Sequence, residues 1–477
     1  MVKSCCLRSL YTNPEAFVPE HTTTQCVLFP GICERPVVAK FDQALGSSDG
    51  GAVLLKAADR ELGLIAALGA CLKDDRQEGK VRHELDELLT QRIMAIACGY
   101  EDANDAARLA CDPVHKLLVG RDPVEGEDLA SQPTLSRFEN SVSRKELFRM
   151  AEALADTVIE RHRKRLRGRA RLITLDLDPT DDPAHGAQQL TFFNWHYDTY
   201  CYLPMVGFLT FNHEAEQYLV TAVLRPGNAP GSSGAVGLLR RLIERLTEAF
   251  PKAKIRVRLD GGFAAPEVLH FLDCEPKVQY LVNFASNTVL KRKAASAMKR
   301  ARRDSKISGQ TEHVYAECQY RTRKSWPWKR RVIYKAEVVR AKGKKPKDNP
   351  RFVVTNMKQS PQWLYEEVYC QRGDLENRIK ELHYGMEIGR TSCTSFWANQ
   401  LRVLMTAAAY VLMQELRSGL AGTASARAQV STLRERFLKL GAQVVASVRR
   451  IVLHLPRSFP YLDSFHRLAL NLGARSG

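Results

Sequence analysis

The order of hydrophobic patterns between residues 171 and 283 restricts the fold more than any other feature of the sequence. Residues 172–178 alternate apolar and polar side chains, which is typical of a strand with one buried face. Later segments predict two strands, a helix, a strand, a short helix and a last strand: residues 189–194, 202–208, 235–249, 255–259, 266–272 and 278–283. This succession predicts an α/β fold in which helices cover a mixed sheet.

The segments on either side of this region have helical periodicity. Residues 57–100 and 144–165 place apolar side chains three or four positions apart, and residues 395–472 are helical again. The longest apolar run, residues 403–413, is about half the length that spans a bilayer, so we expect a buried core helix there. Residues 1–17 contain no continuous apolar segment of the kind that signal peptides have. The sequence therefore favours a cytoplasmic protein.

Positive charge is concentrated in one segment of the chain. The net charge of +18 favours a polyanionic partner such as nucleic acid, and an anionic membrane surface is the competing interpretation. Residues 291–347 hold 20 Lys and Arg against four Asp and Glu, so this segment alone carries 20 − 4 = +16. An isolated charge run is usually a solvated surface, but such a concentration indicates a surface that follows phosphates.

Aromatic residues are interleaved with these cations. Trp326 and Trp328 stand beside Lys329, Arg330 and Arg331. Aromatic rings between cations can stack on exposed bases while the cations hold the nucleic-acid backbone. The alternative is that both tryptophans are hydrophobic anchors of a small sheet, and the sequence leaves the two interpretations open.

Two aspartates follow predicted strands. Asp178 ends the first strand and Asp260 ends the fourth, and in a sheet of this order these strands are neighbours. Ligands bind in crevices at the carboxyl ends of strands in such sheets, although an Asp that only caps a turn is the commoner case. Asp176 points to the same side of the strand as Asp178 and is its rival.

A third acidic residue lies on a predicted helix, residues 361–384. Tyr369, Arg372 and Glu376 stand at positions i, i+3 and i+7 and share one helical face, which Lys380 and His383 continue. A carboxylate beside an aromatic ring and cations suits a metal ion and a phosphate, whereas Glu–Lys pairing on an exposed face is the alternative. Two or three carboxylates from separate elements suffice to hold Mg²⁺, which prefers oxygen ligands.

The segment that begins at Tyr369 resembles the Y-x₂-R-x₃-E-x₆-K signature of bacterial insertion-sequence DDE transposases. Within that group the chain resembles the insertion-sequence 1380 family. The signature ends in lysine, but His383 stands at that position here, and Lys380 is the nearest candidate for the missing cation. The supporting stretches span roughly residues 35–420 and are residues 47–51, 99–105, 129–140, 176–186, 351–356 and 390–393.

The pattern and the resemblance together imply a ribonuclease-H-like mixed sheet flanked by helices, with an inserted basic β-rich subdomain and helical N- and C-terminal regions. We therefore expect five regions. They are a helical DNA-end-binding region at 1–165, the first part of the core at 166–290, the basic β-rich insertion at 291–358, the core completed by the catalytic helix at 359–420, and a helical C-terminal region at 421–477.

Carried over by position, the resemblance implies that Asp178, Asp260 and Glu376 are both the catalytic residues and the metal ligands. It implies two Mg²⁺ ions, for which Mn²⁺ substitutes. The residues expected to contact DNA are Tyr369, Arg372, Lys380, His383, Trp326, Lys329, Arg330 and Arg331. Trp326 is also the expected acceptor of a base that is flipped out of the DNA.

The resemblance implies a DNA transposase that binds the terminal inverted repeats of an insertion sequence, cleaves DNA at its ends and joins the 3′-hydroxyl ends to target DNA. The expected partners are double-stranded DNA of the transposon ends and target, and a second copy of the chain in a homodimer on DNA, with no membrane. The expected location is the bacterial cytoplasm, at the nucleoid. A two-metal DNA nuclease that cuts without joining and a non-catalytic DNA-binding protein are the alternatives.

Overall fold

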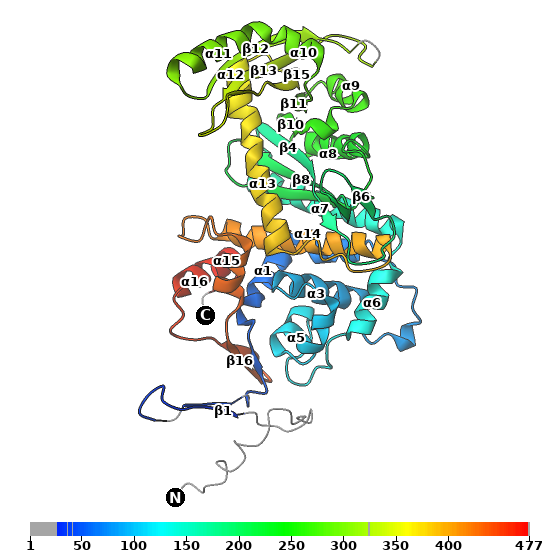
Figure 1. The fold of residues 1–477 in the computed structure, drawn as a ribbon. Helices are drawn as coiled ribbons and strands as arrows, with labels where there is room; N and C mark the ends of the chain where they lie inside the picture. The colour runs from blue at the N-terminus through cyan, green and yellow to red at the C-terminus, as the bar shows by residue number, and fades with distance from the viewer. Residues whose placement is uncertain (1–25, 36, 41, 323–324, 476–477) are drawn as a thin grey trace, which may run out of the picture.

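The computed structural model of the chain describes residues 26–35, 37–40, 42–322 and 325–475 (Figure 1). Residues 1–17, on which the expectation about a signal peptide rests, lie outside the described residues. The molecule is elongated, with the helices of the N-terminal region at one end and α11 and β12 at the other (Figure 1). The long helix α14 crosses between these two halves.

A mixed sheet forms the centre of the fold. Its strand order is β12-β13-β15-β11-β10-β4-β8-β9, and the short β14 pairs with β13. The strands are β4 (Leu172–Pro179), β8 (Met205–Phe211), β9 (Tyr218–Val223), β10 (Lys254–Leu259), β11 (Val278–Phe284), β12 (Glu312–Tyr320), β13 (Arg330–Val339), β14 (Lys347–Asp348) and β15 (Arg351–Thr355). Strands β4, β10 and β11 are mutually parallel, whereas the other pairs are antiparallel. The three parallel strands therefore end at the same edge of the sheet.

Two predicted strands differ from the observed ones. Residues 189–194 contribute only β6 (Phe192–Asn194), which pairs with β7 (Thr199–Tyr202) in a separate small sheet that β5 (Asp182–Pro183) completes. In chain order, the strands that follow β4 in the central sheet are β8 and β9. The sequence did not reveal β9 because its residues are apolar or buried on both faces, so that no alternation marks it.

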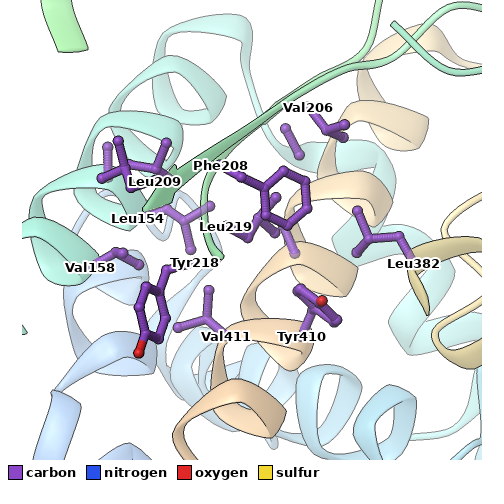
Figure 2. Close-up of a cluster of buried hydrophobic side chains, with 14 of the residues drawn as sticks. Leu154, Val158, Val206, Phe208, Leu209, Tyr218, Leu219, Leu382, Tyr410 and Val411 are labelled. Atoms are coloured by element: carbon purple, nitrogen blue, oxygen red, sulfur yellow. The ribbon is translucent and has the colours of Figure 1, made fainter. Parts of the chain in front are cut away.

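Helices α7 (Arg144–Arg165) and α8 (Ala235–Ala249) have the bounds that the sequence predicted, and α9 (Pro266–Cys274) is close to its prediction. Helices α7 and α14 (Phe396–Gly419) pack against β9, while α8 packs against β10. Figure 2 shows part of this core, where Val158 of α7, Leu219 of β9 and Val411 of α14 meet. The α/β class that the sequence predicted is confirmed.

Helix α14 is buried over most of its length, which confirms the core helix expected at residues 403–413. Two of its polar side chains bind the edge strand: Gln414 accepts the Leu219 N–H at 3.0 Å, and Gln400 accepts the Leu224 N–H at 2.6 Å. These bonds cover the free edge of β9, which would otherwise present unpaired backbone groups. Within the described ranges, no helix combines the length and the apolar character that a membrane span needs.

The strands of the basic segment continue the central sheet. It begins with two helices, α10 (Thr288–Lys293) and α11 (Ala295–Ser308), and then contributes β12 to β15. Because β15 pairs with both β11 and β13, the strands of this segment are joined to the core sheet by backbone hydrogen bonds. Helix α11 packs on β12 and β13, and the sheet continues from β11 through β15 and β13 to β12.

The N-terminal region is mainly helical, as expected. Its elements are β1 (Cys26–Phe29), β2 (Val37–Lys40), β3 (Gly46–Ser47), η1 (Gly50–Ala52), α1 (Val53–Leu62), α2 (Leu64–Gly69), η2 (Glu78–Lys80), α3 (Leu85–Ala97), η3 (Ala103–Asp105), α4 (Ala106–Leu109), α5 (Pro113–Val119) and α6 (Gln132–Ser141). Helix α7 connects this region to the core: it packs on α2 of the N-terminal region and on β9 of the central sheet.

The C-terminal region is not wholly helical, which corrects the sequence prediction for residues 421–477. After α15 (Val430–Leu433) and the π-helical turn η8 (Arg434–Leu438), strands β16 (Ala442–Ser447) and β17 (Arg450–His454) form a hairpin before α16 (Leu462–Asn471). The hairpin forms because β-branched residues here alternate in burial along β16. Strand β16 also pairs with β3, so the two ends of the described chain meet in one small sheet.

Candidate active site

Asp178 and Asp260 lie side by side at the ends of adjacent parallel strands. In the register of β4 and β10, Arg258 is the partner of Asp176, and their side chains bond at 2.6 Å. Side chains two residues apart share a face of a strand, so Asp178 and Asp260 come next on that same face. One oxygen of Asp260 accepts the Gly262 N–H at 3.0 Å, which is the turn-capping role that the sequence left open. The other oxygen accepts no hydrogen bond from the described residues.

Asp176, the rival of Asp178, is committed to a buried ion pair. The residue is fully buried, and Arg258 donates to its two oxygens from Nε and Nη2 at 2.7 and 2.6 Å. Gln217 reaches the same carboxylate at 3.4 Å, and Arg258 also donates to the Val368 carbonyl oxygen. Both oxygens of Asp176 are therefore occupied inside the sheet, so this residue is poorly suited to hold a metal ion at the surface.

The helical segment predicted at residues 361–384 changes its hydrogen-bond pattern along its length. It consists of α12 (Pro361–Trp363), the π-helical turn η5 (Leu364–Tyr369), the 3-10 turn η6 (Cys370–Arg372), α13 (Gly373–Lys380) and the π-helical turn η7 (Glu381–Gly385). Residues at positions i, i+3 and i+7 share one face only in a uniform α-helix. This condition holds only from Arg372 to Lys380. Single π-helical turns within helices are often found at functional sites.

Arg372 reaches from this segment to the strand end. Its Nη2 lies 2.6 Å from an Asp178 oxygen, and the two side chains are only 13 % and 16 % exposed. Burial lowers the pKa of Arg372, but the negative charges of Asp178 and Asp260 outweigh this effect and raise it. Tyr369 is close to the same charges: burial raises its pKa to about 12, and Asp260 acts in the same direction. The structure thus brings Asp178, Asp260, Tyr369 and Arg372 together.

Glu376 and Lys380 are exposed on α13. Glu376 follows Arg372 by four residues, so it lies about 40° round the helix axis from the residue that contacts Asp178. Leu375 points into the core on the neighbouring side of the helix, and therefore Glu376 stands at the border between the packed face and solvent. Glu376 has no hydrogen-bond or ion-pair partner among the described residues.

His383 binds the loop that follows Asp178. Its Nε2 lies 2.7 Å from the Thr180 hydroxyl oxygen. Burial lowers the pKa of His383, although the charges of Asp181 and Glu387 oppose this effect. The ring is therefore neutral near pH 7, and it does not replace the positive charge of the lysine that the transposase signature has at this position. Arg372 and His383 together fix the helical segment against the end of β4.

The charge at this site suits a divalent cation. Burial raises the pKa of Asp178 to about 6; the ion pair with Arg372 lowers it, and the negative charge of Asp260 raises it further. One guanidinium thus leaves the two neighbouring carboxylates incompletely compensated. Carboxylate oxygens are the donors that Mg²⁺ prefers, and this ion keeps several waters and needs few protein ligands. Asp178 and Asp260 fit such an ion by donor type and by charge, and Glu376 is an exposed carboxylate one helical turn after Arg372.

The residues that the sequence proposed for DNA contact in the basic segment differ in exposure. Lys329 is exposed, but Arg330 is 3 % exposed, pairs with Asp273 at 2.7 Å and stacks on the ring of Trp326 at 4.6 Å. Arg331 donates to Glu317 and to two carbonyl oxygens. Trp326 is 4 % exposed and packs against Phe284 and Tyr320, as in the hydrophobic-anchor alternative, so a base could stack on it only after it left this packing.

Two residues beside the aspartates were not identified from the sequence. Arg225, only 6 % exposed, donates through Nε to the Leu203 carbonyl oxygen and through Nη1 to three carbonyl oxygens of residues 230–233. Its Nη2 has no hydrogen-bond partner among the described residues. Burial lowers the pKa of Arg225 to about 10, and the charge of Asp260 opposes this. Burial raises the pKa of Tyr197 to about 12, and Asp181, Asp178 and Asp260 act in the same direction.

A second buried group of potential metal ligands lies in the N-terminal region. Ligand atoms of Asp49, Cys98 and His115 are within 4.8 Å of one another. However, Asp49 is already paired on both oxygens, with His115 Nε2 at 2.9 Å and Lys439 Nζ at 2.8 Å. Burial raises the pKa of the Cys98 thiol, which disfavours the thiolate that a metal needs. This group is better explained as an ion-paired link between η1 and the C-terminal region.

A large cavity lies away from the two aspartates. It has a volume of about 1160 Å³, lies in the N-terminal region and is lined by side chains of both charges, among them Lys73, Arg137, Asp128 and Glu146. Because these charges largely offset one another, the cavity has no clear preference for an anion or a cation.

Comparison with known protein families identifies the family of the chain. The family model described as "Transposase DDE domain group 1" matches residues 29–476, which is nearly the whole chain. No curated protein matches the chain significantly.

Proposed function

This chain belongs to the transposases of DDE domain group 1, and we propose that it binds the terminal inverted repeats of an insertion sequence, cleaves DNA at its ends and joins the 3′-hydroxyl ends to target DNA. The observation that supports this most strongly is the pair Asp178 and Asp260 at the ends of β4 and β10, with the Arg372 guanidinium 2.6 Å from Asp178. In this proposal Glu376 is the third catalytic carboxylate.

The proposed chemistry consists of two successive displacements at phosphorus. In the first, the oxygen of a water molecule attacks the phosphodiester at the transposon end, and the 3′-oxygen leaves and takes up a proton. In the second, this 3′-hydroxyl loses its proton and attacks a phosphodiester of the target, whose own 3′-oxygen leaves. Mg²⁺ ions held by Asp178, Asp260 and Glu376 would supply positive charge beside the attacking and leaving oxygens.

Arg372 and Tyr369 would bind and orient the phosphate. Arg372 is buried, already faces the carboxylates, and its Nε has no hydrogen-bond partner among the described residues. A guanidinium can bind two phosphate oxygens at once, which fixes the orientation of the group. Lys380 would add a cation on the exposed side of α13. Arg225 would act indirectly, because it holds the loop at residues 230–233. This loop packs against Gly262, which lies next to Asp260.

The strand order supports the finer identification of the fold. Three antiparallel strands, β9-β8-β4, followed outward by the parallel β10 and β11, form the arrangement expected of a ribonuclease-H-like core. We further propose that the chain is closest to the insertion-sequence 1380 family, on the motifs that surround Tyr369 and Asp178. The basic helices α10 and α11 are the proposed phosphate-tracking surface, and a homodimer on DNA is the proposed assembly.

The test is cleavage of a plasmid that carries the DNA flanking the gene for this chain, with and without Mg²⁺. We expect nicks at the transposon ends only with the ion, and joining to a second plasmid. Asp178→Asn, Asp260→Asn and Glu376→Gln should each abolish cleavage while DNA binding persists. The matched control is Asp374→Asn: Asp374 is an exposed acid of the same helix and lies about 160° round the axis from Glu376.

Each result assigns the chain to one of the candidate functions. Cleavage without joining would identify a two-metal nuclease, and binding without any Mg²⁺-dependent nick would identify a non-catalytic DNA-binding protein. Cleavage by Glu376→Gln at the wild-type rate would remove this residue from the site, and loss of cleavage in Asp374→Asn as well would show that the substitutions act through the helix and not through the carboxylate.

A further inference from the structure

A hairpin of aromatic residues lies beside the two aspartates and takes no part in the chemistry proposed above. This aromatic hairpin, residues 192–202, consists of β6, β7 and the four residues between them. Trp195 is 89 % exposed and Tyr200 is 62 % exposed, and the ring of Phe193 packs edge-on against both, at 4.9 and 5.4 Å. A contiguous group of exposed rings on a soluble protein commonly marks a binding surface.

The hairpin is anchored to the segment that carries Asp178. Strand β7 pairs with β5, which begins four residues after Asp178, and Tyr202 is the register partner of Asp182. The Ala184 N–H donates to the Tyr200 carbonyl oxygen at 2.9 Å. The position of the exposed rings is therefore fixed relative to the end of β4.

The hairpin is also anchored to the loop between β9 and α8, which packs against the turn that follows Asp260. The Asn194 side chain donates to the Gly227 carbonyl oxygen at 2.8 Å, and Gly227 packs so tightly that a Cβ there would lie 2.0 Å from the Cys201 carbonyl oxygen. Further along the same loop, Gly231 packs against Gly262, whose N–H donates to Asp260. The aromatic hairpin thus contacts the segment that follows Asp178 and the loop that packs against the turn after Asp260.

The tip of the hairpin presents different side chains to the aspartates and to solvent. Tyr197 is partly buried among Asp181, Asp178 and Asp260, whose charges act on its hydroxyl. Trp195, two residues earlier, projects into solvent. The exposed rings therefore belong to the same hairpin as Tyr197, which lies close to the aspartates where the proposed function puts the scissile phosphate.

We propose that the aromatic hairpin is a stacking surface for unpaired nucleobases of the DNA strand whose phosphate lies at Asp178 and Asp260. Every base has a flat face that stacks on Trp or Tyr without regard to sequence. A second copy of the chain is a weaker candidate, because Trp195 and Tyr200 together bury roughly 300–500 Å², whereas one partner contributes about 800 Å² to a stable interface. The proposal rests on the proposed function only for the identity of the strand.

The test measures binding of the full-length chain, without cleavage. The probe is a dye-labelled oligo-dT of about 12 nucleotides, which offers unpaired bases throughout, and its Kd is measured by fluorescence anisotropy at one salt concentration. We expect Trp195→Ala to raise Kd about 5- to 150-fold for one stacked base, and Trp195→Phe to stay within about threefold of the wild type because it keeps an aromatic face. Trp363→Ala, at a tryptophan that is 40 % exposed on α12, is the matched control and should leave Kd unchanged.

A fully paired duplex and a cleavage assay distinguish this proposal from the proposed function. Trp195→Ala should bind the duplex as the wild type does, since phosphate contacts dominate there. An unchanged Kd of Trp195→Ala for oligo-dT would overturn the stacking surface even if the enzyme cleaves DNA. Loss of a dimer in Trp195→Ala with unchanged DNA binding would assign the rings to a second copy and overturn it too. A weakened Kd in a chain that cleaves nothing would keep the stacking surface and reject the transposase chemistry.

Discussion

Replacing Asp176 by asparagine separates the two aspartates of β4 by their effect on stability. Asp176 is fully buried, and Arg258, about 4 % exposed, donates to both of its oxygens at 2.7 and 2.6 Å. Asp176→Asn keeps the shape and one acceptor but leaves the buried guanidinium without a counter-charge. Removing one partner of a buried ion pair costs about 3–5 kcal/mol. We expect about 3 kcal/mol, because Arg258 keeps its bond to the Val368 carbonyl oxygen.

The assay is urea unfolding of the wild type, Asp176→Asn and Asp178→Asn, with cleavage measured where all three are folded. The free energy of unfolding of Asp178→Asn should equal that of the wild type or exceed it, because burial raises the pKa of this carboxyl and so makes its charged form unfavourable in the fold. Asp178→Asn should abolish cleavage, whereas folded Asp176→Asn should retain it. The double variant Asp176→Leu/Arg258→Met should recover most of the lost stability.

The opposite pattern would refute this reasoning. If Asp176→Asn unfolds within about 1 kcal/mol of the wild type and cleaves no DNA, Asp176 holds the metal ion and its bond to Arg258 is incidental. If Asp178→Asn is the strongly destabilised variant, the carboxylate at the strand end is structural.

Three further predictions concern other parts of the chain. Burial lowers the pKa of His162 to about 3, below its value of about 6.5 in the unfolded chain. The contribution of His162 to stability is therefore fully present above pH 6.5 and is lost as the pH falls below that value. Between pH 7 and pH 5 the free energy of unfolding should drop by about 2 kcal/mol more in the wild type than in His162→Gln, and equal pH slopes would contradict this. Replacing Lys291, Lys293 and Lys299 by Gln should make the slope of log K against log salt for duplex binding less steep. The expected change is about 0.9 for each phosphate that these lysines neutralise in the wild type, and an unchanged slope would place the DNA on another surface. Arg225→Leu should lower the free energy of unfolding by at least about 2 kcal/mol, because four carbonyl oxygens lose their donor; a neutral effect in urea unfolding would show that the loop at residues 230–233 needs no such support.

The elements with a clear amphipathic pattern could be predicted from the sequence. Helices α7 and α8 have the expected bounds, and β4 and β10 were found because each ends a regular pattern at an acidic residue. Strand β9 could not be found in this way. It packs against α7 and α14 and is buried along nearly its whole length, so its residues do not alternate between apolar and exposed polar types. The hairpin of β16 and β17 was missed because its strands are only six and five residues long, and runs this short do not show a clear helical or strand period.

The candidate site was predictable where local sequence sets the geometry. Because β4 and β10 are adjacent, their register places Asp178 beside Asp260. The spacing of four residues places Glu376 near the helical face of Arg372. Arg225 could not be inferred, because its partners are backbone carbonyl oxygens, which have no sequence signal. The burial of Arg330 and Trp326 likewise depends on Asp273 and Phe284, which lie more than 40 positions away in the chain.

The central claim is that Asp178, Asp260 and Glu376 hold divalent ions together. The most direct measurement is anomalous diffraction from crystals of the chain bound to its end DNA in Mn²⁺. Two manganese peaks should appear about 3.5–4 Å apart, with all three carboxylates as ligands. Manganese bound at Asp178 and Asp260 with Glu376 still turned toward solvent, or no peak at the ends of β4 and β10, would contradict the assignment.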